Sequence, residues 1–236
     1  MPWRRRRWNR CQPSSDRLST GYFSLFLQIT HCSTERGRNV GFAIEQYAAL
    51  RPTLWHLTHS QNLDSIRKSR VLMPAEHLIS TTRDGPRHGR QIIPGIPVLR
   101  DQDLLHEKCI AFEPGSSMAD FLRELHRRVF FWSGWPNGPI KPGRNAIDRY
   151  SESDVLIRLP FREVAKDHMP YFSRCNSGAT RMQNGRPVPR GPGTFVKALQ
   201  CDFLPSKVVE VTFVQPVKLP PGSEVARFLR GPWEIL

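Results

Sequence analysis

The sequence lacks the patterns that mark metal sites, disulfide frameworks and membrane spans. Its five cysteines are odd in number, and none forms a Cys-x-x-Cys pair or has a histidine at zinc-ligand spacing. We therefore expect no metal site and no disulfide framework, which favours a reducing compartment, the cytoplasm. No apolar run reaches the roughly 18–20 residues that a membrane-spanning helix needs, so we expect no membrane partner.

The common catalytic motifs are also missing. The chain has no Gly-rich phosphate loop ending in Lys-Ser or Lys-Thr, no Gly-x-Ser-x-Gly elbow and no His-Glu-x-x-His helix. Any functional assignment therefore depends on several weaker patterns, none of which indicates a function by itself.

Acidic residues are few beside basic ones. The chain has 21 Asp and Glu against 35 Lys and Arg, a net charge of +14. Such a charge attracts polyanions and favours nucleic acid as a partner, although a basic surface that only maintains solubility explains the same balance. Residues 1–40 hold eight arginines against Asp16 and Glu35, which is +6 of the total and leaves +8 for the rest.

Residues 1–42 differ in character from the remainder of the chain. A basic start and the short apolar stretch 22–29 imitate a signal peptide, but Gln28 interrupts the stretch and no small-residue cleavage site comes after it. The segment has no sustained helical or strand periodicity. We predict a poorly ordered basic segment, with an Arg/Trp-rich nucleic-acid arm as the alternative, and a single domain over residues 43–236. The oligomeric state stays open.

The segment after residue 42 alternates short strands, helices and turns. Periodicity predicts helices over 43–50, 61–69, 101–110 and 117–127, and strands over 53–59, 128–132, 154–159, 195–199 and 208–213. Turn residues fill 133–145 and 173–193. Without a repeat or a regular strand–helix alternation, the class expected is α+β with a mixed or antiparallel sheet.

The strand at 53–59 carries the first functional pattern. Alternation places His56 and Thr58 on one face, where an imidazole and a hydroxyl can contact a sugar diol; a buried structural histidine is the alternative. The segment Trp-His-Leu-Thr-His, followed by Asn62-Leu63 and a Ser-Ile helix, resembles the opening of ADP-ribosyltransferases of the DarT type. Arg70 stands where that family has a glycine. A similar His-x-Thr start occurs in RNA 2′-phosphotransferases, which also use NAD.

Further segments resemble a bacterial domain family of unknown function, over roughly residues 44–220. They are Leu-Arg-Asp-Gln (99–102), Arg-Val-Phe-Phe-Trp (128–132), Asn-Ser-Gly-Ala (176–179), Arg-Gly-x-x-Thr-Phe (190–195) and Val-Glu-Val (209–211). Kinship of this family to DarT-type enzymes implies an ADP-ribosyltransferase-like split sheet with flanking helices.

Glu210 is the candidate catalytic carboxylate. A lone charge in the apolar run Val-Val-Glu-Val-Thr-Phe is costly unless it faces solvent or has a partner, and an exposed edge-strand position is the simpler interpretation. The resemblance implies instead a late-strand Glu that hydrogen-bonds the nicotinamide ribose of NAD and stabilises the state formed as nicotinamide leaves. It also implies a catalytic arginine in the loop before the Phe-Phe-Trp strand, for which we favour Arg90.

The same resemblance implies a set of NAD contacts, each with a plain structural alternative. The arginines are otherwise solvated or ion-paired, the aromatic pair is otherwise core, and the Asn-Ser pair is otherwise a tight turn. The candidate NAD-binding residues are His56, Thr58, Asn62, Arg100, Phe131, Trp132, Asn176, Ser177 and Arg190.

Three functions remain as hypotheses. The first is an NAD-dependent ADP-ribosyltransferase that modifies nucleic acid, fitting a toxin or phage-defence effector with an antitoxin partner. The second is a non-catalytic basic module on the same fold that binds nucleic acid or a nucleotide. The third is an enzyme similar to the RNA 2′-phosphotransferases, or an NAD hydrolase.

Overall fold

The computed structural model describes residues 41–80, 98, 105–149, 153–178 and 185–236. Contacts between Cα atoms divide the chain into residues 1–36 and 37–236, and all the described elements belong to the second unit. The expectations for residues 1–40, for Arg90 and for Arg100 lie outside the described residues. Phe42, the last residue of the expected N-terminal segment, is buried against the core, so the packed domain includes it.

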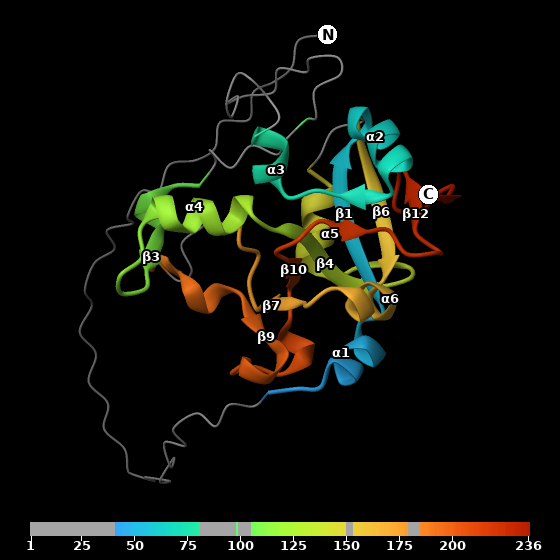
Figure 1. The fold of residues 1–236 in the computed structure, drawn as a ribbon. Coiled ribbons are helices and arrows are strands. Elements are labelled where there is room, and N and C mark those ends of the chain that lie inside the picture. The colour runs from blue at the N-terminus through green and yellow to red at the C-terminus, as the bar shows by residue number, and fades with distance from the viewer. Residues whose placement is uncertain (1–40, 81–97, 99–104, 150–152, 179–184) are drawn as a thin grey trace, which may run out of the picture. The chain divides into compact units, whose positions relative to one another are not determined.

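Short elements make up the domain (Figure 1). The α-helices are α1 Ile44–Leu50, α2 Leu63–Ser69, α3 Ala75–Ser80, α4 Met118–His126, α5 Lys141–Ile147 and α6 Phe161–Asp167. The first strands are β1 Thr53–His59, β2 Val71–Leu72, β3 Ile110–Phe112, β4 Val129–Trp135, β5 Gly138–Pro139, β6 Asp154–Pro160 and β7 Tyr171–Ser173. The later strands are β8 Val188–Arg190, β9 Val196–Lys197, β10 Glu210–Phe213, β11 Val217–Lys218, β12 Glu224–Ala226 and β13 Glu234–Ile235.

Nine of these strands form one sheet in the order β13-β12-β6-β1-β4-β10-β7-β9, with β5 paired to β4. Every pairing in this sheet is antiparallel, whereas the separate pair β3·β8 is parallel. The α+β class with a mostly antiparallel central sheet is therefore confirmed.

The two neighbours of β1 are paired over different lengths. β1 pairs with β6 along all seven residues from Thr53 to His59, but with β4 only from Thr53 to Trp55. Beyond Trp55, β1 and β4 diverge and no longer pair with each other. On its other side, β4 stays paired with β10 from Val129 to Trp132.

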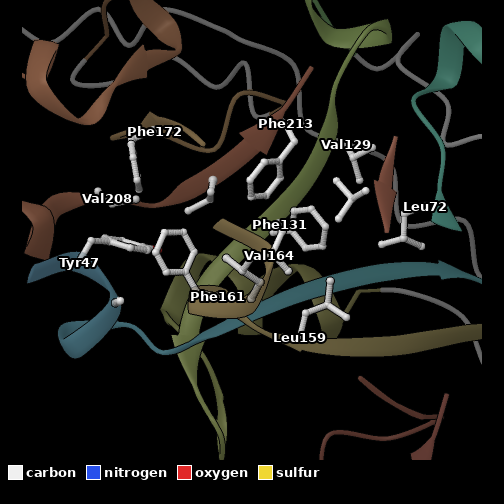
Figure 2. Packing of buried hydrophobic residues seen from close by; sticks show 14 of the residues in the cluster. Tyr47, Leu72, Val129, Phe131, Leu159, Phe161, Val164, Phe172, Val208 and Phe213 are labelled. Atoms are coloured by element: carbon white, nitrogen blue, oxygen red, sulfur yellow. The ribbon is translucent and has the colours of Figure 1, made fainter. Parts of the chain in front are cut away.

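The sheet has an apolar layer on each face because side chains alternate along every strand. Leu54 belongs with Phe131 and Phe213 to the large core, whose members point toward one another in Figure 2. Trp55 and Leu57 belong to the second core, which α5 covers through Ala146. Leu54 and Trp55 thus lie on opposite faces of the sheet, as the alternation expected of a strand requires.

Several local expectations were wrong. β8 lies inside the turn region expected over 173–193, and the strand expected over 195–199 is reduced to β9. The helix expected over 101–110 is, in its described part, a 3₁₀ turn at Glu107–Cys109 that leads into β3. The turn region expected over 133–145 instead completes β4 and forms β5 and α5. Pro142 is compatible with α5 because the first turn of a helix needs no donor from that residue. A Cβ on Gly143 would lie 2.9 Å from the Trp132 ring, so the glycine serves helix–sheet packing.

Arg70 occupies the position at which the resemblance led us to expect glycine. Its φ of 57° lies in the left-handed region, which glycine adopts without a steric penalty. The Arg70 carbonyl accepts the Leu219 amide at 2.8 Å, and the Arg70 guanidinium lies 3.5 Å from the carbonyl oxygens of Leu219 and Pro220. These contacts offset the strain of the αL conformation.

Among the described residues, no helix combines the length and the apolar character needed to cross a bilayer.

Candidate functional site

Glu210 is a buried carboxyl group in the middle of the sheet. It begins β10, paired with Trp132 on one side and Ser173 on the other, and only 4% of its surface is exposed. The exposed edge-strand interpretation is therefore wrong. The Ser177 amide donates to Glu210 Oε2 at 3.0 Å, and the Ser177 hydroxyl is a further partner of the carboxyl group.

Burial raises the pKa of Glu210 to about 7. The amide and hydroxyl of Ser177 and the positive charge of Arg190 favour the carboxylate and so oppose this rise. Because the pKa lies close to neutrality, Glu210 can either hold or release a proton near pH 7. A group with this property suits acid–base chemistry or the stabilisation of developing positive charge.

The segment Ser173–Ser177 wraps around this carboxyl group. The Ser173 hydroxyl accepts the Cys175 amide at 3.3 Å and donates to the Cys175 carbonyl at 3.1 Å, forming a tight turn. The turn places the Ser177 amide against Glu210. Burial raises the pKa of the Cys175 thiol, which is therefore protonated at neutral pH and not an activated nucleophile.

Arg190 secures the same segment. Its guanidinium, in a residue that is 3% exposed, donates to the carbonyl oxygens of Ser177 at 3.4 Å, Asn176 at 3.2 Å and Pro189 at 2.7 Å. A planar group with several donors can satisfy three carbonyls at once, which a lysine cannot do with the same geometry. The structure thus brings together four predicted site residues, Asn176, Ser177, Arg190 and Glu210.

The segment after Arg190 has a clear packing reason for its glycines. Glu113, next to β3, accepts the Gly193 amide at 3.0 Å, and a Cβ on Gly191 would lie 2.7 Å from the Glu113 side chain. Thr194 accepts the Gly191 amide at 2.9 Å. The Arg-Gly-x-x-Thr-Phe pattern therefore holds β8 and Arg190 in place against β3.

We expect Arg190→Gln to reduce the free energy of unfolding by about 2 kcal/mol, because buried carbonyls lose their donors. The same change removes a positive charge and should raise the pKa of Glu210 further. Arg190→Lys keeps the charge, so it should cost similar stability but shift the pKa less. Urea unfolding and a carboxyl ¹³C NMR titration measure the two effects, and equal pKa values in both variants would contradict the electrostatic role.

His56 lies where β1 and β4 diverge. Its Nδ1 lies 2.9 Å from the Phe130 carbonyl oxygen, and since a carbonyl can only accept, Nδ1 carries the proton. The imidazole thus replaces a main-chain contact where the β1–β4 ladder stops. Its ring centroid is 5.5 Å from that of Phe131.

His56 and Glu210 project from opposite faces of the sheet. His56 is opposite Ile157, a member of the large core, whereas Glu210 is opposite Trp132, a member of the second core. Alternation along the strands then assigns the two side chains to different faces. The pair does not converge in one cavity.

Thr58 and Asn62 bind each other and the chain at Val98. The Asn62 amide donates to Thr58 Oγ1 at 3.0 Å and to the Val98 carbonyl at 2.9 Å, and Asn62 Oδ1 accepts the Val98 amide at 2.8 Å. This side chain replaces a pair of strand hydrogen bonds and attaches Val98 to the end of β1.

We expect Asn62→Ala to cost about 2 kcal/mol of unfolding free energy, because it removes three partly buried hydrogen bonds. The Val98 amide should lose its protection in hydrogen exchange. Asn145→Ala, at an exposed position of α5, is the matched control. Unchanged exchange at Val98 in the Asn62 variant would show that other contacts hold this residue.

Phe131 and Trp132 are both core residues. Phe131 is 1% exposed and packs edge-to-face on Phe213, with ring centroids 5.6 Å apart. Trp132 is 9% exposed and packs beside Trp55 and against Gly143. Their packing favours the core interpretation over stacking on a ligand.

Within the described ranges, no group of three or more His, Cys, Asp or Glu side chains is arranged to hold a metal ion.

No sequence pattern predicted a groove beside the segment Ser173–Ser177, where four basic side chains and one tryptophan come together. This groove is lined by residues from separate parts of the chain, among them Arg51, Trp135, Lys141, Arg174 and Lys207. Each of them stood in a predicted turn or an element end, where a single charge has no visible pattern. Only the overall excess of basic residues signalled such a surface.

Comparisons with known proteins give an extensive match and a shorter one. A family model with the description "Family of unknown function (DUF7002)" matches residues 52–219, which is 168 of the 236 residues. The chain is also similar to the 3-hydroxyacyl-[acyl-carrier-protein] dehydratase FabZ of Nitrosospira multiformis, with 27% identity over 95 residues. That stretch covers 40% of this chain and 64% of the dehydratase, less than two thirds of its length.

Proposed function

The chain belongs to the family of unknown function DUF7002, and we propose that it is an NAD-dependent ADP-ribosyltransferase that uses Glu210 and modifies nucleic acid. The observation that carries the proposal is the buried carboxyl group of Glu210, held by Ser177 and close to the charge of Arg190. Sequence resemblance had singled out these residues from separate segments of the chain.

The chemistry assigned to Glu210 is consistent with its surroundings. In the reaction, the bond between the nicotinamide-bearing ribose and the nicotinamide nitrogen breaks, and nicotinamide leaves with the bonding electrons. A nucleophile of the acceptor then bonds to the same ribose carbon and releases a proton. A carboxylate in a site of low polarity stabilises the positive charge that develops on the ribose, and it can accept that proton.

The divergence of β1 and β4 supports an ADP-ribosyltransferase-like split of the sheet. The two strands share only three paired residues, and His56 lies at the point where they separate. Because His56 and Glu210 face opposite sides, we assign the bond-breaking step to Glu210 and not to His56. His56 then has a positioning role, because its imidazole holds β4 where the pairing with β1 stops.

A second candidate is a binding module without catalysis. It is favoured by the near-complete burial of Glu210, and by the groove lined with cations beside it. In this case Glu210 and Arg190 would form a polar support for the segment Ser173–Ser177, and the protein would bind nucleic acid or a nucleotide without turning over NAD.

The direct test incubates the full chain with NAD labelled in the adenylate phosphate, together with single-stranded DNA, duplex DNA or RNA. Transfer of label to a nucleic acid with release of nicotinamide is the expected result. Nicotinamide release without transfer would instead identify an NAD hydrolase, and label on protein alone would exclude nucleic acid as acceptor. Absence of nicotinamide release under all these conditions would reject the enzyme and leave the binding module.

A further inference from the structure

A basic groove lies beside the Glu210 segment, at one end of the central strands. It has a volume of about 690 Å³ and is bordered by the end of β4, the residue after β7 and the approach to β10. Four of its lining residues are cations, Arg51, Lys141, Arg174 and Lys207, and none is an Asp or Glu. The groove is therefore a concave surface of one charge.

An aromatic ring lies among these cations. The Trp135 residue is 38% exposed, and the Arg51 guanidinium carbon lies 3.9 Å from the centroid of its ring. The Arg51 Nε atom is buried and has no hydrogen-bond partner among the described residues. Stacked Arg and Trp side chains offer flat surfaces that can extend onto a nucleobase.

The remaining cations are available to a ligand. Lys141 and Lys207 are exposed, and neither forms an ion pair with another described residue. Arg174 lies 3.7 Å from Asp202, but both side chains are about two-thirds exposed. An ion pair so exposed is worth little, so Arg174 can exchange this partner for a phosphate.

The groove and the carboxyl group are connected through the chain. Val209 lines the groove and immediately precedes Glu210, while Arg174 lines it three residues before Ser177. The Val209 amide donates to the Ser173 carbonyl at 2.8 Å, which joins the two segments at this point. A polymer held in the groove would thus pass beside the segments that carry the Glu210 site.

We propose that this groove binds single-stranded nucleic acid, with phosphates against its four cations and a base stacked at Trp135 and Arg51. The inference rests on the proposed function in one respect, namely that nucleic acid is the acceptor. Binding of nucleic acid to the groove does not itself require NAD. The exposed aromatic ring favours nucleic acid over an acidic peptide, because a nucleobase can stack on it while a carboxylate cannot. Cations contact phosphates and a stacked ring contacts the face of any base, so we expect sequence-tolerant binding.

The test is fluorescence anisotropy of the full chain with labelled dT15, rU15, a 15-base-pair duplex and a polyglutamate peptide, all without NAD. Lys141→Glu with Lys207→Glu should weaken binding of dT15 and rU15 at least about tenfold. It should also reduce the slope of log K against log salt by about 1.4, since each lost phosphate contact on a single strand removes about 0.7. The matched control, Lys197→Glu with Lys218→Glu, changes two exposed lysines outside the groove by the same charge.

Trp135→Ala should weaken single-strand binding about tenfold without changing the salt slope, because stacking involves no phosphate. Equal losses in the groove and control variants would assign binding to the charge of the whole chain and overturn the proposal. Polyglutamate binding with the same sensitivity to the groove lysines would identify an acidic-peptide site instead. Because no NAD is present, failure here leaves the assignment of Glu210 to be judged by nicotinamide release alone.

Discussion

Glu210→Gln is expected to lower NAD turnover at pH 8 by about 100-fold or more, measured as nicotinamide release. Glutamine keeps the size and the hydrogen-bond acceptor for Ser177 but cannot carry a negative charge. Removing one well-placed electrostatic group from an active site costs about 10²–10³ in rate. Because burial raises the pKa of Glu210 to about 7, wild-type activity should increase with pH through this value.

Glu163→Gln is the matched control for this experiment. Glu163 lies on α6 and forms an exposed ion pair with Lys166, so the same chemical change is made on the surface. The control should keep wild-type turnover. Equal turnover in the Glu210→Gln protein and the wild type would remove Glu210 from the mechanism and with it the proposed enzyme.

The second large effect concerns stability, and it does not depend on any activity. Between the unfolded pKa of about 4.5 and the folded pKa of about 7, the folded protein holds a proton on Glu210 that the unfolded chain has released. Wild-type stability therefore falls as the pH rises through this window. The full cost is about 3 kcal/mol, since each pKa unit corresponds to about 1.4 kcal/mol.

Glutamine removes this titration, so Glu210→Gln should gain stability relative to the wild type as the pH rises. Between pH 5.5 and pH 8.5, we expect the difference in unfolding free energy to change by about 2 kcal/mol in favour of the variant. Urea unfolding followed by tryptophan fluorescence at several pH values measures it. A difference that stays constant with pH would show that Glu210 has an ordinary pKa and is ionised in the folded protein.

Together, the two experiments separate a functional carboxyl group from a structural one. A variant that is more stable at pH 8.5 but inactive is the pattern of a site that sacrifices stability for chemistry. A variant that is less stable at every pH would indicate that Glu210 serves mainly to hold Ser177 and its turn.

The sequence by itself determined the class of the domain and the identity of its central strands. Strict alternation around His56 predicted β1 with its correct extent, because a two-residue period does not fit a helix. The apolar run around Glu210 predicted a strand over 208–213, of which residues Glu210–Phe213 form β10. The helix predicted over 117–127 is α4 Met118–His126, and the Ser117 hydroxyl caps it by accepting the Asp120 amide. Such signals are local, so sequence alone carries them.

Only the tertiary structure decided what surrounds each functional residue. Periodicity favoured an exposed Glu210, and the pairing of β10 between β4 and β7 made it buried. The segment 133–145 had the Gly and Pro content of turns, yet packing of Gly143 on Trp132 allows α5 to form there. The opposite orientation of His56 and Glu210 and the assembly of the basic groove depend on strand order and register. Those are set by contacts between distant segments, which no local pattern encodes.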